Sequence, residues 1–153
     1  MYTIIFDWKR TLYDPESKQL IEGAINILKF LTIKWSNVIL IGKGGADMYQ
    51  EVKRLKVEEY FSKIIFQEGK KDMKVFSKFV SIKNPKLTMI VGDRVQSEIE
   101  IGNMLNATTI WIKQGKFSEE LPLNKFQEPT FTFNSLIDLS VFFHSKFNPQ
   151  IPA

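Results

Sequence analysis

The stretch IIFDWKRTLYDP, residues 4–15, carries the strongest indication of the fold. Three apolar residues lead directly into Asp7, and Lys9 and Thr11 follow shortly after it. A short and continuously apolar run is typical of a buried strand, which we expect over residues 2–7. Because the acid comes where this strand ends, it is expected at the edge of a sheet.

Similar apolar runs recur along the chain, and segments with helical spacing of apolar residues separate them. Met48, Val52 and Leu55, for example, fall on one face of a predicted helix. Buried strands that alternate with helices are typical of the doubly wound α/β class, with a mainly parallel sheet of five to six strands. The further strands are expected at 37–41 (NVILI), 63–66 (KIIF), 87–93 (LTMIVGD), 108–113 (TTIWIK) and 130–133 (TFTF).

Length and composition favour one domain and are compatible with a reducing cytosol. The 153 residues suit a single domain over 1–153, with a loose tail over 146–153. The chain has no cysteine, which excludes disulfides and thiolate metal sites. We see no signal peptide and no apolar run long enough to cross a membrane, so we expect a cytoplasmic protein without a membrane partner.

The net charge of +4 has two interpretations. A basic protein can bind nucleic acid or an anionic substrate. Here the lysines are spread along the chain, and no basic run is interleaved with aromatic residues as in a nucleic-acid platform. The composition therefore favours a lysine-rich surface over a nucleic-acid partner.

Polar residues gather where the predicted strands end. Those ends meet at one edge of a parallel sheet, where open α/β sheets bind their ligands. Carboxylates at such an edge can hold Mg²⁺ beside phosphate oxygens, and one of them can act as a nucleophile. Lysines can neutralise the charge, so the set suits phosphoryl transfer. The residues concerned are Asp7, Gly42, Lys43, Gly44, Lys70, Lys71, Asp93 and Glu98.

These residues fall into an ordered series of motifs that resembles the haloacid dehalogenase (HAD) superfamily. The family's DxDxT motif resembles IIFDWKRTL, its lysine motif resembles KKDMKVF (70–76), and its GDxxxxD motif resembles VGDRVQSEIEIGN (91–103). Order and spacing agree over about residues 2–117, which is more specific than any single motif. The resemblance implies a three-layer, Rossmann-like fold and, for most members, a Mg²⁺-dependent phosphatase.

The resemblance also implies roles for individual residues. It makes Asp7 the nucleophile and first metal ligand, and Asp93 and Glu98 the acids of the last motif that bind the metal. Lys70 best matches the motif lysine, with Lys71 as the alternative that can also contact substrate.

Two motif positions differ from the family pattern. Lys9 replaces the second aspartate, which protonates the leaving group, although the Lys9 carbonyl remains available to the metal. An ammonium with a pKa near ~10.4 can donate a proton but is a poor base at neutral pH. Gly42 and Lys43 replace the expected Ser or Thr, so we expect either the backbone amides of Gly42 to Gly45, Gly44 among them, or the Lys43 ammonium to contact the phosphate. The motif residue Thr11 is likewise expected to bind substrate.

The gaps between motifs are too short for the cap domain that many family members insert. An open site suits a phosphorylated substrate that is itself macromolecular. The leading prediction is a Mg²⁺-dependent phosphohydrolase with an aspartyl-phosphate intermediate. The first alternative is a catalytically weak module that binds phosphate or protein, and a weaker one is a nucleic-acid-associated factor. Nothing in the sequence indicates an oligomeric state.

Overall fold

A single parallel sheet forms the centre of the computed structural model, which describes residues 1–34 and 36–147. All its neighbouring strands pair in parallel, in the order β5-β4-β1-β6-β7-β8. The chain starts in the middle, builds outward to β5, and then returns to β6 beside β1. The predicted α/β class is confirmed. The strands are β1 (Thr3–Phe6), β4 (Asn37–Lys43), β5 (Lys63–Gln67), β6 (Thr88–Gly92), β7 (Thr108–Ile112) and β8 (Phe131–Phe133).

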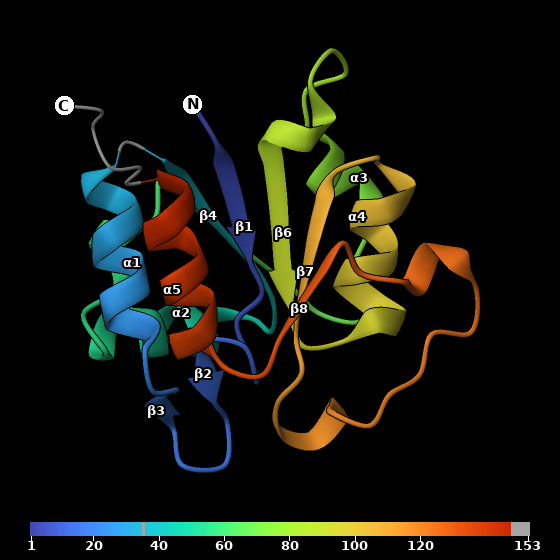
Figure 1. The fold of residues 1–153 in the computed structure, drawn as a ribbon. Coiled ribbons are helices and arrows are strands. Elements are labelled where there is room, and N and C mark those ends of the chain that lie inside the picture. The colour runs from blue at the N-terminus through green and yellow to red at the C-terminus, as the bar shows by residue number, and fades with distance from the viewer. Residues whose placement is uncertain (35, 148–153) are drawn as a thin grey trace, which may run out of the picture.

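Helices cover both faces of the sheet (Figure 1). One face carries α1 (Ala24–Ile33), α2 (Ala46–Arg54) and α5 (Leu136–Phe147), and the other carries α3 (Met73–Ser77) and α4 (Glu100–Met104). Strand β1 serves both layers, because successive side chains point to opposite faces. Ile4 and Phe6 pack into the core beneath α1, α2 and α5, while Ile5 packs into the core beneath α3 and α4.

Several local elements differ from the sequence prediction. An antiparallel hairpin of β2 (Tyr13–Asp14) and β3 (Gln19–Leu20) follows β1, in a segment for which no strand was predicted. The Tyr13 hydroxyl anchors this hairpin to α2 by donating a hydrogen bond to Glu51 Oε1 at 2.7 Å. The helix after β6 begins with a π-helical turn, Val95–Ile99. Short 3₁₀ turns lie at Glu58–Tyr60, Pro85–Leu87, Gly115–Phe117 and Lys125–Gln127.

The last helix extends further than predicted. Lys146 and Phe147, expected to begin a loose tail, are the final residues of α5. The Phe147 ring packs edge-on against Tyr2, with 4.8 Å between the ring centroids, and this contact holds the helix end against the core. The rest of the predicted tail, 148–153, lies outside the described residues. Within 1–34 and 36–147, none of the helices is both long enough and apolar enough to pass through a membrane.

Candidate active site

Three buried carboxylates lie together at the carboxyl ends of the two central strands. Asp7 follows β1 and Asp93 follows β6, two strands that pair directly, and Glu98 comes from the π-helical turn after β6. One carboxylate oxygen from each lies within 4.8 Å of the others. Their exposed fractions are 5%, 2% and 3%. The structure thus brings together the three acids that the sequence placed at strand ends.

Hydrogen bonds from two neighbouring residues orient this cluster. The Thr11 hydroxyl donates to Asp7 Oδ2 at 3.0 Å and lies 3.4 Å from Asp93 Oδ1. The Trp111 indole N–H donates to the Asp93 carbonyl at 2.9 Å. Because Thr11 is fully buried behind the carboxylates, the structure gives it an orienting role in place of the predicted contact with substrate.

A glycine allows Glu98 to reach the cluster. A Cβ atom built at Gly92 would lie 2.6 Å from Glu98 Oε2, so any side chain there would displace the carboxylate. The π-helical turn that carries Glu98 is wider than an α-helical turn, and such turns are frequent at functional sites. The π-helical turn and the absence of a side chain at Gly92 together allow Glu98 to join the other two acids.

Lys71 provides the positive charge beside the carboxylates. Its ammonium forms ion pairs with Asp7 and, at 2.5 Å, with Glu98, and its side chain is only 5% exposed. Burial alone would lower the pKa of Lys71, but the two carboxylates outweigh burial and raise it, so the group stays charged.

Lys70, the residue preferred from the motif alignment, is exposed on the cavity wall. No ion pair involving it occurs among the described residues. Gly69 adopts a left-handed φ of 77° just before this segment, in the turn that follows β5. Lys71, two residues further on, is the lysine whose ammonium reaches the acids, whereas the motif alignment had preferred Lys70.

The electrostatics of the cluster favour a bound cation. Burial, followed by the charges of Asp7 and Glu98, raises the pKa of Asp93 to about 9. Burial and the charge of Asp7 likewise raise the pKa of Glu98, against the opposing effect of Lys71. Asp93 Oδ2 and Glu98 Oε2 are buried without a hydrogen-bond partner in the described part of the chain. Mg²⁺ is usually bound through one or two carboxylates together with waters and phosphate oxygens, and this cluster offers such carboxylates beside an open cavity, so the residues fit that ion.

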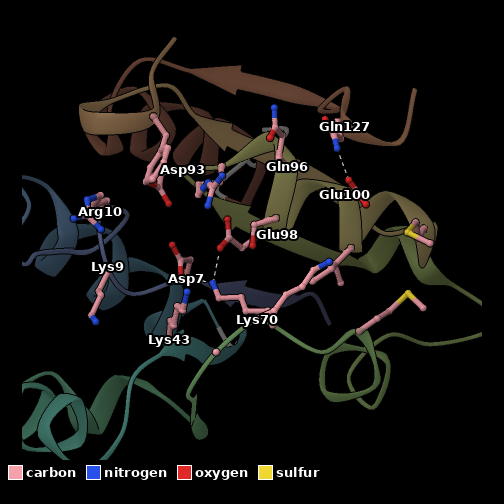
Figure 2. A pocket seen from close by; sticks show the side chains of 18 residues that line it. Asp7, Lys9, Arg10, Lys43, Lys70, Asp93, Gln96, Glu98, Glu100 and Gln127 are labelled. Atoms are coloured by element: carbon pink, nitrogen blue, oxygen red, sulfur yellow. Dashed lines mark hydrogen bonds and ion pairs between the residues drawn. The ribbon is translucent and has the colours of Figure 1, made fainter. Parts of the chain in front are cut away.

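The carboxylates open into a cavity of about 800 Å³. In Figure 2 the Lys43 ammonium points toward Asp7, whereas the Lys9 ammonium points away from it. No ion pair between Lys9 and Asp7 occurs among the described residues, so Lys9 leaves the carboxylate free for other partners. The cationic side chains along the wall are Lys71 and, besides it, Lys9, Arg10, Lys43, Lys70 and Arg94.

The glycines after β4 have a packing role in place of the predicted phosphate contacts. Neither Gly42 nor Gly44 lines the cavity. A Cβ at Gly42 would come within 2.8 Å of the Trp8 side chain, and the Gly44 amide already donates to the Gln67 carbonyl at 2.9 Å. Of the predicted phosphate-binding segment, Lys43 alone faces the cavity.

Sequence reasoning missed several residues of the cavity wall. Arg10 and Arg94 directly follow Lys9 and Asp93, so their position inside the motifs was a usable signal. Phe117 comes from the long connection after β7, where the sequence indicates only a loop. No spacing rule identifies such a residue, because the loop is positioned by contacts made after the chain has folded.

Comparison with known proteins agrees with this architecture. The HAD-hydrolase-like family model matches residues 63–139, which is half of the chain. The mitochondrial phosphatidylglycerophosphatase GEP4 of Saccharomyces cerevisiae is 34% identical over 53 residues. That match covers 35% of this chain and 29% of GEP4, so the chain corresponds to less than a third of this relative.

Two solved structures resemble the whole described fold. A HAD phosphatase from Thermococcus onnurineus superposes with a TM-score of 0.77 at 13% identity, over 94% of this chain and 98% of its own. The D,D-heptose 1,7-bisphosphate phosphatase from B. bronchiseptica, complexed with magnesium and phosphate, superposes with a TM-score of 0.75 at 13% identity. This match covers 95% of this chain and 99% of the phosphatase. At such identities the likeness establishes the fold.

Proposed function

The chain belongs to the HAD-hydrolase-like family, and we propose that it is a Mg²⁺-dependent phosphohydrolase with Asp7 as its nucleophile. The observation that carries this proposal is the buried cluster of Asp7, Asp93 and Glu98 at the carboxyl ends of the central strands. The names of the relatives support it, since one is a phosphatidylglycerophosphatase and another was complexed with magnesium and phosphate.

Mg²⁺ would be held by Asp7, Asp93 and Glu98, with the Lys9 carbonyl as a further proposed ligand. Bound there, the ion supplies positive charge that offsets the repulsion between an anionic carboxylate and an incoming phosphate. Asp93 Oδ2 and Glu98 Oε2 support this arrangement, because both oxygens are buried without a described partner.

The proposed reaction has two steps. A carboxylate oxygen of Asp7 attacks phosphorus, the bond from phosphorus to the leaving oxygen breaks, and that oxygen takes up a proton. Water then attacks the phosphorus of the aspartyl phosphate, which releases inorganic phosphate and restores the carboxylate. Lys71 and Lys43 neutralise charge on the phosphoryl oxygens, and Thr11 holds Asp7 in place.

Lys9 is the residue that separates this proposal from an alternative. Its ammonium can protonate a leaving group but is a poor base for activating water. A module that binds phosphate with little turnover is therefore the second candidate, and the direction of the Lys9 ammonium, away from Asp7, favours it. Under the leading proposal the protein hydrolyses p-nitrophenyl phosphate with Mg²⁺ and loses this activity with a chelator. A phosphate-binding module would show neither.

The substitution Lys9→Asp further distinguishes a phosphohydrolase from a phosphate-binding module. If the second step is limited by the missing acid and base, this substitution increases turnover. If Lys9 has its own role in the reaction, turnover falls. A binding module without a productive site would gain nothing from the change.

The short connections between motifs support a site without a cap domain. Between β1 and β4 lie the β2–β3 hairpin and α1, and between β4 and β5 lie α2 and one 3₁₀ turn. We propose a phosphorylated substrate that such an open site can admit. The cytoplasmic location stays a prediction.

A further inference from the structure

Two arginines on the cavity wall are held in place by contacts outside the carboxylate cluster. Arg94 Nε and Nη2 both donate to Glu120 Oε2, at 3.1 and 2.8 Å, and the Glu120 side chain is only 8% exposed. The Arg94 guanidinium also lies 4.2 Å from the centre of the Phe117 ring. A cation over an aromatic face is attracted to it, so this guanidinium has a fixed position.

Arg10 lies against the same aromatic residue. Its guanidinium carbon is 5.9 Å from the Phe117 ring centre, and Nη2 pairs with Glu16 at 3.2 Å. Arg10 Nε is buried and has no hydrogen-bond partner among the described residues. The backbone of Arg10 has a left-handed φ of 66°, which is uncommon for residues other than glycine. Gln114 supports this conformation by donating to the Arg10 carbonyl at 3.2 Å.

Both arginines adjoin the carboxylate cluster in the sequence and line its cavity. Arg10 precedes Thr11, which bonds to Asp7, and Arg94 follows Asp93. A guanidinium has five N–H donors, and Arg94 uses only two of its nitrogens in the described hydrogen bonds. Donors therefore remain for a ligand that occupies the cavity. The planar guanidinium matches phosphate oxygens better than a lysine does.

The cavity wall carries more cationic side chains than the phosphate beside Asp7 uses in the proposed reaction. Its wall carries six cationic and four acidic side chains, and one acid, Glu100, accepts a hydrogen bond from Gln127. Lys71 and Lys43 already serve the phosphate beside Asp7. Arg10 and Arg94 line the same cavity, but the proposed reaction at Asp7 gives neither of them a role.

We propose that Arg10 and Arg94, positioned by Phe117, bind a second phosphate on the leaving group, so that the preferred substrates are bisphosphorylated compounds. This inference rests on the proposed phosphatase site and adds its substrate class. The arginines are specificity-determining residues, because they contact the leaving group and leave the phosphorus that Asp7 attacks to Lys71 and Lys43.

The test compares two sugars that differ by one phosphate, fructose 1,6-bisphosphate and fructose 6-phosphate. Binding is measured by calorimetry with Mg²⁺ in Asp7→Asn protein, which prevents turnover during the titration. We expect the bisphosphate to bind about tenfold more tightly or better, as for a charge-assisted contact. Arg10→Ala and Arg94→Ala should each remove most of this preference and leave the monophosphate affinity nearly unchanged.

Lys125→Ala is the matched control. Lys125 is a cation in the connection after β7, which also carries Phe117, but it does not line the cavity. It should keep the preference. Arg94→Lys keeps a charge for Glu120 if Arg94→Ala unfolds, and it should lose part of the preference because the planar fork is gone. Equal affinities for the two sugars, no binding of either, or equal losses for both in the arginine variants would overturn the proposal. Hydrolysis of p-nitrophenyl phosphate by the unsubstituted protein tests the phosphatase proposal separately.

Discussion

Lys71 is buried against Asp7, and its ammonium forms an ion pair with the carboxylate proposed as the nucleophile. The same ammonium pairs with Glu98 at 2.5 Å. One lysine therefore balances two acids of the cluster, while Asp93 Oδ2 and Glu98 Oε2 have no hydrogen-bond partner within residues 1–34 and 36–147. This arrangement separates the role of Lys71 from that of its neighbour Lys70 and leads to the first prediction.

Lys71→Met should destabilise the protein and abolish activity. Removing one member of a buried ion pair costs about 3 kcal/mol or more, because the remaining carboxylates lose their compensating charge. Lys70→Met is the control, since Lys70 is exposed and adjacent in the chain. Urea unfolding and p-nitrophenyl phosphate hydrolysis measure the two effects. Equal losses in both variants would contradict the assignment of Lys71.

Asp93→Asn should stabilise the metal-free protein and remove its response to Mg²⁺. In the fold the pKa of Asp93 is raised to about 9 from an ordinary value of 3.8, so the folded state binds the extra proton between these pH values. Metal-free stability due to this group therefore falls as pH rises from about 4 to about 9. Asparagine does not titrate and avoids this loss.

Thermal unfolding across this pH range, with and without Mg²⁺, measures both effects of Asp93→Asn. A ligand present at about 100 times its dissociation constant stabilises the fold by about 2.7 kcal/mol. The unsubstituted protein should show a gain of this kind on adding Mg²⁺, and the variant should not. An unchanged Mg²⁺ response in the variant would rule out Asp93 as a ligand.

Glu51→Gln should reveal an acid-sensitive link between α2 and the β2–β3 hairpin. Hydrogen bonds from Arg54, then from Tyr13, lower the pKa of Glu51 to about 2 from 4.5. Its contribution to stability is thus complete above about pH 4.5 and disappears as pH falls toward 2. The difference in melting temperature between the two proteins should shrink over that interval. A difference that stays constant with pH would show that the carboxylate charge is not involved.

The strands and the acid cluster could be predicted from the sequence, because each depends on local pattern. Apolar runs indicated all six parallel strands, and Asp7 and Asp93 follow directly where two of them end. Glu98 was identified by its spacing within the last motif. The acids that follow these strands lie together in the fold because parallel strands bring their carboxyl ends to one edge of the sheet.

The choice between Lys70 and Lys71 could not be made from the sequence. The motif alignment was ambiguous by one position, and only the folded chain shows that the Lys71 ammonium reaches Asp7 and Glu98. The position of Phe117 was equally hidden, since Arg94 and Glu120 fix that connection through contacts between distant segments. The roles of Gly42 and Gly44 depend on contacts with Trp8 and Met48 that no motif records.

Detection of a phosphoryl group on Asp7 tests the central claim most directly. The protein is incubated with p-nitrophenyl phosphate and Mg²⁺, quenched in acid, digested and analysed by mass spectrometry. We predict a phosphoryl group on the peptide that contains Asp7, which accumulates because Lys9 is a poor base for the second step, and none in Asp7→Asn. Hydrolysis of the substrate without a phosphoryl group on Asp7, or full activity in Asp7→Asn, would contradict the account.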